Sequence, residues 1–197
     1  MRLSRLLGGL AAAASLAVAP AALAQKSDVL VMNQAEVIQK SKAGQSIQTQ
    51  LQTIGQAAQA QLSQEGQKVQ TEGQQLQQTA ESLSQEDLQK RAQALAAKQQ
   101  GVQRLAQIRQ AEVAQAEAAA LTELSEPLEN VVRKIMKKRK AKVVLRRTDV
   151  AVMDDAVDIT DEVIAALDKE VTQITVTKPD LIAQARAQAA QQQSAQQ

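Results

Sequence analysis

The chain has 197 residues with a formal net charge of +2, and it contains no Phe, Trp, Tyr, Cys or His. Without Cys and His it lacks a thiolate nucleophile, a disulfide, the usual zinc ligands and an imidazole base. Without aromatic rings it lacks stacking platforms for single-stranded nucleic acid. Ala and Gln, with 37 and 34 residues, make up over a third of the chain, which favours long helices. No catalytic, cofactor-binding or metal-binding residue is therefore expected, and the chain is predicted not to be an enzyme.

Residues 1–24 have the pattern of a secretory signal peptide. Two arginines precede a short uncharged apolar run, residues 6–19, and an A-x-A cleavage signal ends at Ala24. The run is too short to span a membrane. Cleavage after Ala24 would leave 173 residues with 21 basic and 21 acidic side chains. The net charge of +2 therefore applies to the uncleaved chain, and the cleaved chain has a net charge of zero. The sequence predicts an exported protein without an overall basic field for nucleic acid.

Residues 25–44 are predicted to form the first part of a small body. Residues 28–33 are an apolar run rich in β-formers and bounded by polar residues, which is typical of a buried strand. Residues 34–42 have a helical composition, and Gly44 is expected to break or bend this short helix.

Residues 45–127 are predicted to form a long helical hairpin arm. Apolar residues recur in steps of three and four, as in a coiled-coil seam. The pattern is interrupted at residues 84–86, where Ser84 and Asp87 resemble a capping box that starts a second helix. If the chain turns there, facing residues have numbers that sum to about 171, and apolar residues then meet apolar residues along both arms. Each arm of about 40 residues would be roughly 60 Å long.

Residues 128–177 are predicted to form the second part of the body. Pro127 is expected to kink the second helix or to mark a segment break, and residues 128–136 keep a helical stripe after it. After the arm, residues 143–145 and 150–153 are short β-rich runs separated by a polar turn, and together they predict a β-hairpin.

The end of the chain is predicted to contain one further helix and a tail. Asp158 or Thr160 is expected to cap a helix whose first turn is acidic, which favours the helix dipole. Residues 178–197 are rich in Ala and Gln and predict a frayed helix or a disordered tail.

The expected fold class is therefore α+β and mostly α. A three-stranded sheet with one helix and only aliphatic residues to bury would form a body of about 70 residues. Such a body is too small to be stable without disulfides, a bound metal or association with other copies. Since disulfides are absent and no zinc-type ligands are available, oligomerisation through the body is the expected source of stability.

Two groups of cations are candidate binding residues. The larger group indicates an anionic partner, such as an anionic membrane surface or an acidic client segment, or else a solvated face balanced by nearby acids. Its members are Arg133, Lys134, Lys137, Lys138, Arg139, Lys140, Lys142, Arg146 and Arg147. The smaller group lies near the predicted arm tip and comprises Lys90, Arg91 and Lys98.

Three stretches carry a family signature in addition to these patterns. They are residues 29–44, residues 143–152 and residues 158–168, of which the last is the most specific, reading D-I-T-D-E-V-I before Leu167 and Asp168. In this order around a helical hairpin they resemble the Skp/OmpH family of periplasmic chaperones.

The resemblance implies a homotrimer in which three hairpins hang from a central β-rich body. The cavity between the hairpins would hold unfolded outer-membrane proteins, without ATP, cofactor or catalysis. The chain would then be a holdase that prevents aggregation. A different class of function also fits the pattern, namely a structural coiled-coil adaptor or spacer of the cell envelope that docks one fixed partner.

Overall fold

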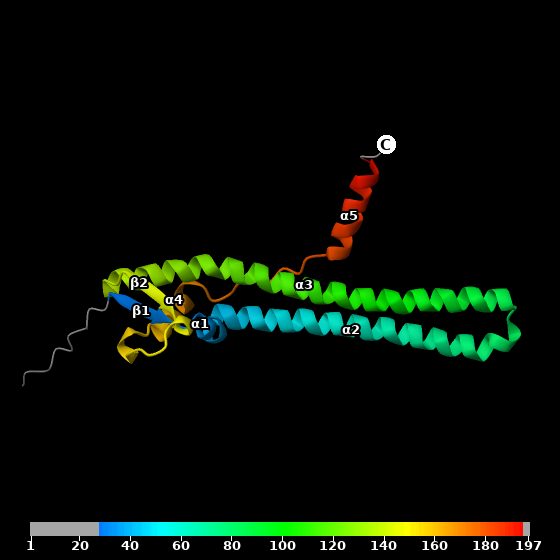
Figure 1. Ribbon diagram of the computed structural model, residues 1–197, viewed down its shortest axis with the longest axis horizontal. Coiled ribbons are helices and arrows are strands. Elements are labelled where there is room, and N and C mark those ends of the chain that lie inside the picture. Colours follow the sequence, from blue (N-terminus) through cyan, green and yellow to red (C-terminus); the bar gives the residue numbers. More distant parts are fainter. Residues whose placement is uncertain (1–27, 195–197) are drawn as a thin grey trace, which may run out of the picture.

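The structure, a computed structural model, describes residues 28–194. The predicted signal peptide lies outside the described residues. The described part is mostly helical, with one small sheet near one end of a long arm (Figure 1). In chain order the strands and helices are β1 (Val29–Met32), α1 (Gln34–Lys40), α2 (Lys42–Thr79), α3 (Gln85–Arg139), β2 (Val143–Arg146), α4 (Thr160–Glu170) and α5 (Leu181–Ser194).

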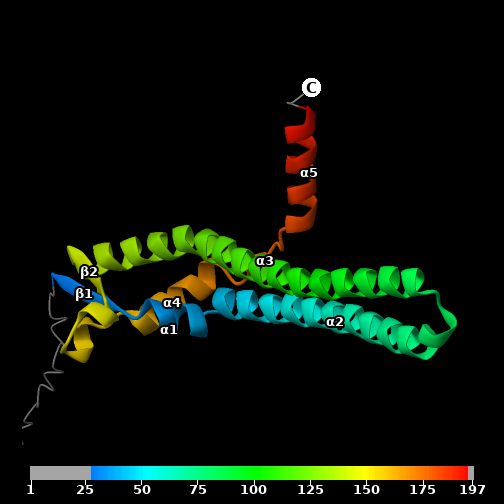
Figure 2. The same ribbon diagram turned by 45° about the vertical axis from the view of Figure 1, so that its right-hand side comes forward.

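The predicted hairpin arm is confirmed. Helices α2 and α3 lie side by side over the length of α2 in both views (Figures 1 and 2). The chain turns through a 3₁₀ turn at Ala80–Ser82, slightly earlier than expected. Ser84 caps α3 as predicted, because its hydroxyl oxygen accepts a hydrogen bond from the Asp87 amide at 3.1 Å.

The predicted register of the two arms is confirmed to within one residue. Lys98 of α3 donates to both carboxylate oxygens of Glu72 of α2, at 2.5 and 2.6 Å. Arg109 of α3 donates to Gln61 of α2 at 3.1 Å. Each pair of residue numbers sums to 170, against the expected 171. The seam is thin, because α3 has no buried residue before Glu112 and α2 has none after Ile47.

Pro127 lies inside α3 and does not end it, so of the two predicted outcomes, a kink and a segment break, the structure agrees with the kink. The helix continues from Gln85 to Arg139, and it bends along its C-terminal part in Figure 2. Its neighbours Leu124 and Leu128 are 1% and 6% exposed. Because these side chains are packed into the core, burial outweighs the lost backbone hydrogen bond at Pro127.

The break between α1 and α2 lies at Ser41 rather than at Gly44. The Ser41 amide ends α1 by donating to the Val37 carbonyl at 2.9 Å, and its hydroxyl oxygen starts α2 by accepting from the Gly44 amide at 3.2 Å. Gly44 is inside α2, where it allows α1 to approach closely. A Cβ at this position would lie 1.6 Å from the Ile38 carbonyl oxygen.

The sheet has two strands and is parallel, so the predicted three-stranded sheet with a β-hairpin is wrong. Val29 pairs with Val143 and Met32 with Arg146. The parallel direction follows from helix lengths, because α3 has 55 residues and α2 has 38. The returning helix therefore overshoots the start of α2, and Lys142 and Val143 donate to the Asp28 carbonyl at the beginning of β1.

Residues 150–153 do not form the predicted third strand. The Arg147–Asp149 segment is a 3₁₀ turn that leads the chain away from β2 rather than folding it back. The other edge of β1 is taken instead by Asp158, which forms an isolated parallel bridge with Val31. Val152 is consequently 89% exposed.

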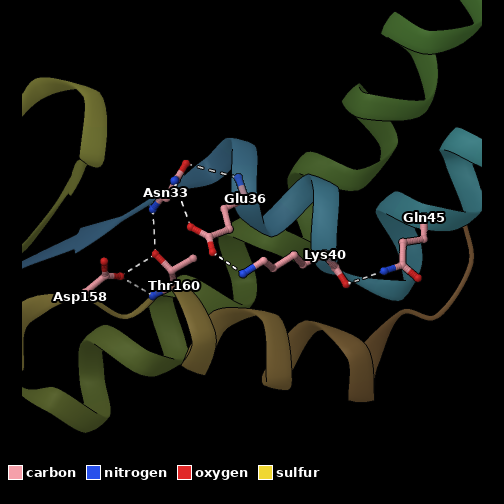
Figure 3. Close-up of polar contacts among 6 residues, drawn as sticks. All are labelled: Asn33, Glu36, Lys40, Gln45, Asp158 and Thr160. Carbon is pink, nitrogen blue, oxygen red and sulfur yellow. Dashed lines mark hydrogen bonds and ion pairs between the residues drawn. The ribbon is translucent and has the colours of Figure 1, made fainter. Parts of the chain in front are cut away.

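A polar junction joins β1, α1 and α4 (Figure 3). The Asn33 side chain caps α1 by accepting from the Glu36 amide at 3.3 Å, while the Asn33 amide donates to Thr160 Oγ1 at 2.9 Å. The Asp158 carboxylate accepts from the Thr160 amide at 2.8 Å. The N-cap residue of α4 is Ile159, whose side chain cannot accept a hydrogen bond, so the prediction of Asp158 or Thr160 as the cap is wrong. Lys40 pairs with Glu36 on the outer side of α1.

The core lies where the body meets the root of the arm. Its buried members come from β1, α1, α2, α3, α4 and the extended segment after α4. They are Leu30, Met32, Val37, Ala43, Ile47, Ala120, Leu124, Leu128, Val131, Ile135, Ile159, Val163, Leu167 and Ile174. The extended segment, residues 171–180, is referred to as the strap. After the strap, α5 projects away from the arm (Figures 1 and 2).

Candidate interaction surfaces

The arm carries two shallow hollows between α2 and α3. The first, near the tip, has a volume of about 390 Å³. It is lined by Glu72, Gln75, Leu76, Thr79, Arg91, Ala94, Leu95 and Lys98. The second, about 420 Å³, lies nearer the body and includes Ala58, Leu62 and Val113. Both combine aliphatic side chains with polar and charged neighbours, which suits weak contacts with an extended chain better than recognition of one compact ligand.

The predicted arm-tip cations are placed differently from one another. Lys90 pairs with Glu86 one turn away on α3, and Lys98 pairs with Glu72 across the arm. Arg91 lines the tip hollow, and among residues 28–194 it has no ion-pair partner. The structure thus leaves Arg91 as the most available cation of the three.

The predicted basic patch lies at the end of α3 and along β2, where most of its members face acidic residues. Each of these pairs is at least partly exposed, so it contributes little to stability. The pairs are Arg133 with Glu129, Lys134 with Glu170, Lys138 and Arg139 with Glu162, Lys142 with Asp28, and Arg146 with Asp149. Hydrogen bonding from Lys138 and Arg139 holds the pKa of the Glu162 carboxyl below its ordinary value, although its burial acts in the opposite direction.

Three members of the basic patch have no acidic partner in the part of the chain that the structure describes. They are Lys137, Lys140 and Arg147, of which Arg147 donates to the Val150 carbonyl at 3.4 Å. The local balance of charge agrees with the solvated-face alternative for six of the nine cations. An anionic partner remains a prediction for the other three.

A buried charged cluster between the arm and the strap was not predicted from the sequence. The Glu112 side chain is fully buried, and it accepts from Arg109 at 2.6 Å, from Lys178 at 2.8 Å and from the Leu181 amide at 3.2 Å. Burial alone would raise the pKa of the Glu112 carboxyl. The hydrogen bonds from Lys178, Arg109 and Leu181 outweigh it, so the pKa lies below its ordinary value.

The sequence contains a pattern that could have predicted the extended strap, but it contains no pattern that predicts the buried contacts of Glu112. Residues 174–177 read Ile-Thr-Val-Thr, and this alternation before Pro179 is typical of an extended segment with one buried face. Glu112, in contrast, looks like any other acid on a polar helix. Its role depends on Lys178, which is 66 residues further along the chain.

The body presents an exposed aliphatic face along its two strands. Val29, Val143 and Leu145 are 40%, 44% and 40% exposed. Beside them a hollow of about 260 Å³ is lined by residues that include Met32, Leu128 and Val132. In the described residues β2 pairs only with β1, so its other edge is open.

The family model described as outer membrane protein (OmpH-like) matches residues 28–167. The chain belongs to this OmpH-like family. The match covers β1, the whole arm, β2 and most of α4, and it ends before the strap. The resemblance to the Skp/OmpH chaperones is thereby confirmed, and since this is a family of chaperones, the protein is not an enzyme.

A solved structure supports the OmpH-like assignment. It is the crystal structure of a protein assigned as an OmpH-like outer membrane chaperone from Caulobacter crescentus CB15. The two chains are 30% identical with a TM-score of 0.74, and the match covers 79% of this chain and 92% of that one. None of the curated sequences compared with the chain matches it. Among residues 28–194, no helix combines the length and hydropathy needed to cross a bilayer.

Proposed function

We propose that the protein is an ATP-independent holdase of the periplasm that encloses unfolded outer-membrane proteins and prevents their aggregation. The observation that carries the proposal is the arm itself. Helices α2 and α3 extend from the body with no buried residue on α3 before Glu112. Such a long exposed hairpin stabilises little of its own fold, but it offers aliphatic and charged side chains along its whole length.

The proposed assembly is a homotrimer in which the bodies associate and the arms surround a cavity. The body of one chain has few buried side chains and an exposed aliphatic face on β1 and β2. An open strand edge beside such a face is a common site of association between copies. The number three rests on the resemblance to the family.

The proposed mechanism is enclosure by many weak contacts. An unfolded client would touch the aliphatic side chains of the arm hollows, such as Leu76 and Leu95, and the cations beside them. Each contact is small, so the client stays mobile while it is kept apart from other clients. No step requires ATP or a cofactor.

The three unpaired cations of the basic patch are proposed to make peripheral contact with an anionic membrane surface. They lie on the body, away from the arm tip. Clustered cations near a surface attract anionic lipids by about 1 kcal/mol each at most. Changing Lys137, Lys140 and Arg147 to Gln should abolish sedimentation with anionic vesicles, and unchanged sedimentation would exclude this contact.

The holdase is tested by diluting an outer-membrane barrel protein from urea and following its light scattering. An equimolar amount of the assembled protein should suppress the scattering, and failure to do so would overturn the proposal. Leu76→Ser with Leu95→Ser should weaken the suppression by removing aliphatic contacts at the tip hollow. The matched control is Gln70→Ser with Gln78→Ser, because these side chains are exposed on the same part of the arm.

The adaptor hypothesis remains the second candidate, since long helical hairpins also serve as spacers. The two functions differ in the range of partners. Affinity capture from a periplasmic extract should yield many barrel proteins if the chain is a holdase. One stoichiometric partner would favour the adaptor.

A further inference from the structure

The strap is packed against the root of the arm rather than lying free beside it. Ile174 is 5% exposed and belongs to the core, and Val171 and Val176 are partly buried against it. In Figures 1 and 2 the segment between α4 and α5 follows α3 before α5 turns away.

Gln50 of α2 clasps the backbone of the strap. Its side-chain amide nitrogen donates to the Ile174 carbonyl at 2.7 Å, and its side-chain oxygen accepts from the Val176 amide at 3.0 Å. One side chain thus satisfies a carbonyl and an amide two residues apart, as a neighbouring β-strand would do. The clasp holds the strap in register with α2.

The Glu112 cluster fixes the far end of the strap. Glu112 of α3 accepts from Lys178 of the strap and from the first amide of α5, at Leu181. Arg109, which pairs with the same carboxylate, also donates to Gln61 of α2. A single buried carboxylate therefore connects the strap and α5 to α3, and through Arg109 to α2.

These contacts lie further out along the arm than its apolar core. On α2 the last buried residue is Ile47, fourteen residues before Gln61, and on α3 the apolar core ends at Ala116, one turn before the cluster begins at Glu112. Fourteen residues of helix correspond to about 20 Å. Only residues 62–79 of α2, about 27 Å of helix, extend beyond the last contact of the cluster.

We infer that the strap is a brace that fixes the root of the arm and moves its pivot outward to the level of Gln61 and Glu112. The part of the arm free to bend is then slightly less than half of α2. This inference rests on the proposed holdase, because a shorter free arm limits how far the cavity widens and so the largest client it accepts. The family match ends at residue 167, so the brace lies outside the part of the chain that the family model describes.

Hydrogen exchange of the full chain without client tests the brace. Gln50→Ala combined with Lys178→Gln removes the clasp and one cation of the cluster, while the helices keep their seam. Amides of residues 50–61 and 105–118 should exchange about tenfold faster or more, whereas amides near the tip should not change. Lys68→Gln is the matched control, because Lys68 forms only a local exposed pair with Glu65.

Unchanged exchange at the root in the double variant would overturn the inference. Glu112→Gln provides a second variant, since it keeps the shape of the side chain and should loosen the same amides. If either variant loses helical content in far-UV circular dichroism, hydrogen exchange of the other variant decides whether the strap braces the arm. Because no client is present, these outcomes are independent of the holdase. If the wild-type protein fails to suppress aggregation, the proposed function fails while the exchange still reports the brace.

Discussion

At the scale of single residues, Gly44 shows how closely two backbones approach at the base of the arm. No side chain fits between α2 and the Ile38 carbonyl. Gly44→Ala should therefore lower the free energy of unfolding by at least about 2 kcal/mol, because α1 must move away from α2. Urea unfolding followed by far-UV circular dichroism measures this, since the chain has no Trp or Tyr.

Gly66→Ala is the matched control for Gly44→Ala. Gly66 is also helical, but a Cβ there would meet nothing within 4 Å. Ala should raise the free energy of unfolding by roughly 0.5–1 kcal/mol, because glycine disfavours a helix interior. Equal effects of the two substitutions would show that the contact with Ile38 does not matter. Protein concentration is held fixed, since association would couple to unfolding.

The buried carboxylate of Glu112 predicts a dependence of stability on pH. Its pKa in the folded state is below the unfolded value of about 4.3. The contribution of the ionised Glu112 carboxyl to the free energy of unfolding is thus fully present above about pH 5. This contribution is lost as the pH falls through the folded-state pKa. Glu112→Gln should cost about 2 kcal/mol at pH 7, and the difference from wild type should shrink below pH 4.

The comparison for Glu112 is urea unfolding of wild type and variant at pH 7 and pH 3. The wild type and the variant share every other ionisable group, so a change of their difference with pH belongs to the Glu112 carboxyl. A difference that is the same at both pH values would contradict the ionised cluster. Lys178 is 36% exposed, so part of its attraction to Glu112 is screened by solvent.

Residues that act through their immediate neighbours could be predicted from the sequence, and residues that act over a distance could not. Ser84 caps α3 through a contact with Asp87, three residues away, and this cap was predicted. Glu112 and Gln50 make their decisive contacts across 66 and more than 120 residues. No periodicity in the sequence records such pairs.

At the scale of secondary-structure elements, periodic helices were predictable and the strands were not. The seam repeats over many turns, so it fixed the arm register to within one residue. The run at residues 150–153 is as apolar as β2, but the 3₁₀ turn at Arg147–Asp149 leads it away from the open edge of β2, and Asp158 takes the other edge of β1. The parallel direction of β1 and β2 depends on the length of α3. This length was uncertain from the sequence, because Pro127 was predicted either to kink the helix or to break it.

The end of α3 offers a prediction at this scale. Lys140 has a φ of 57°, the left-handed conformation that disfavours residues with a Cβ, and its amide caps the helix at the Lys137 carbonyl. Lys140→Gly should leave the free energy of unfolding unchanged or raise it by up to about 1 kcal/mol. Lys137→Gly, inside the helix, should instead lower it by roughly 1 kcal/mol.

The measurement for Lys140 is again urea unfolding by circular dichroism. A clear loss of stability in Lys140→Gly would mean that the lysine side chain itself holds the junction with β2. If stability is kept, the same variant becomes a useful probe of the basic patch. It removes one of the three unpaired cations without disturbing the fold.

At the scale of the whole molecule, the arm and the body have different sources of order. The segments just before and just after the arm meet in the body, because β1 pairs with β2. Its sheet has only two strands, which are marginal alone. The helices of the arm root, together with α4 and the strap, cover one side of the body, and the aliphatic face of β2 remains exposed.

The exposed face predicts that folding of the body is coupled to association. Leu145 is 40% exposed on β2 beside the open strand edge. Leu145→Glu would place a charge in the interface between copies, where it would be desolvated without a partner. The variant should sediment as a monomer under conditions in which the wild type is an oligomer. Its thermal midpoint should also lose the concentration dependence expected of an assembled protein.

Leu88→Glu is the control for Leu145→Glu, because Leu88 is a partly exposed leucine in the first turn of α3, at the opposite end of the arm. It introduces the same charge and should leave the oligomer intact. Sedimentation velocity with interference optics measures both, since the chain lacks a chromophore at 280 nm. If Leu145→Glu sediments like the wild type, β2 is not the interface. Copies of the chain would then have to associate through a surface of the body or arm other than the face of β2.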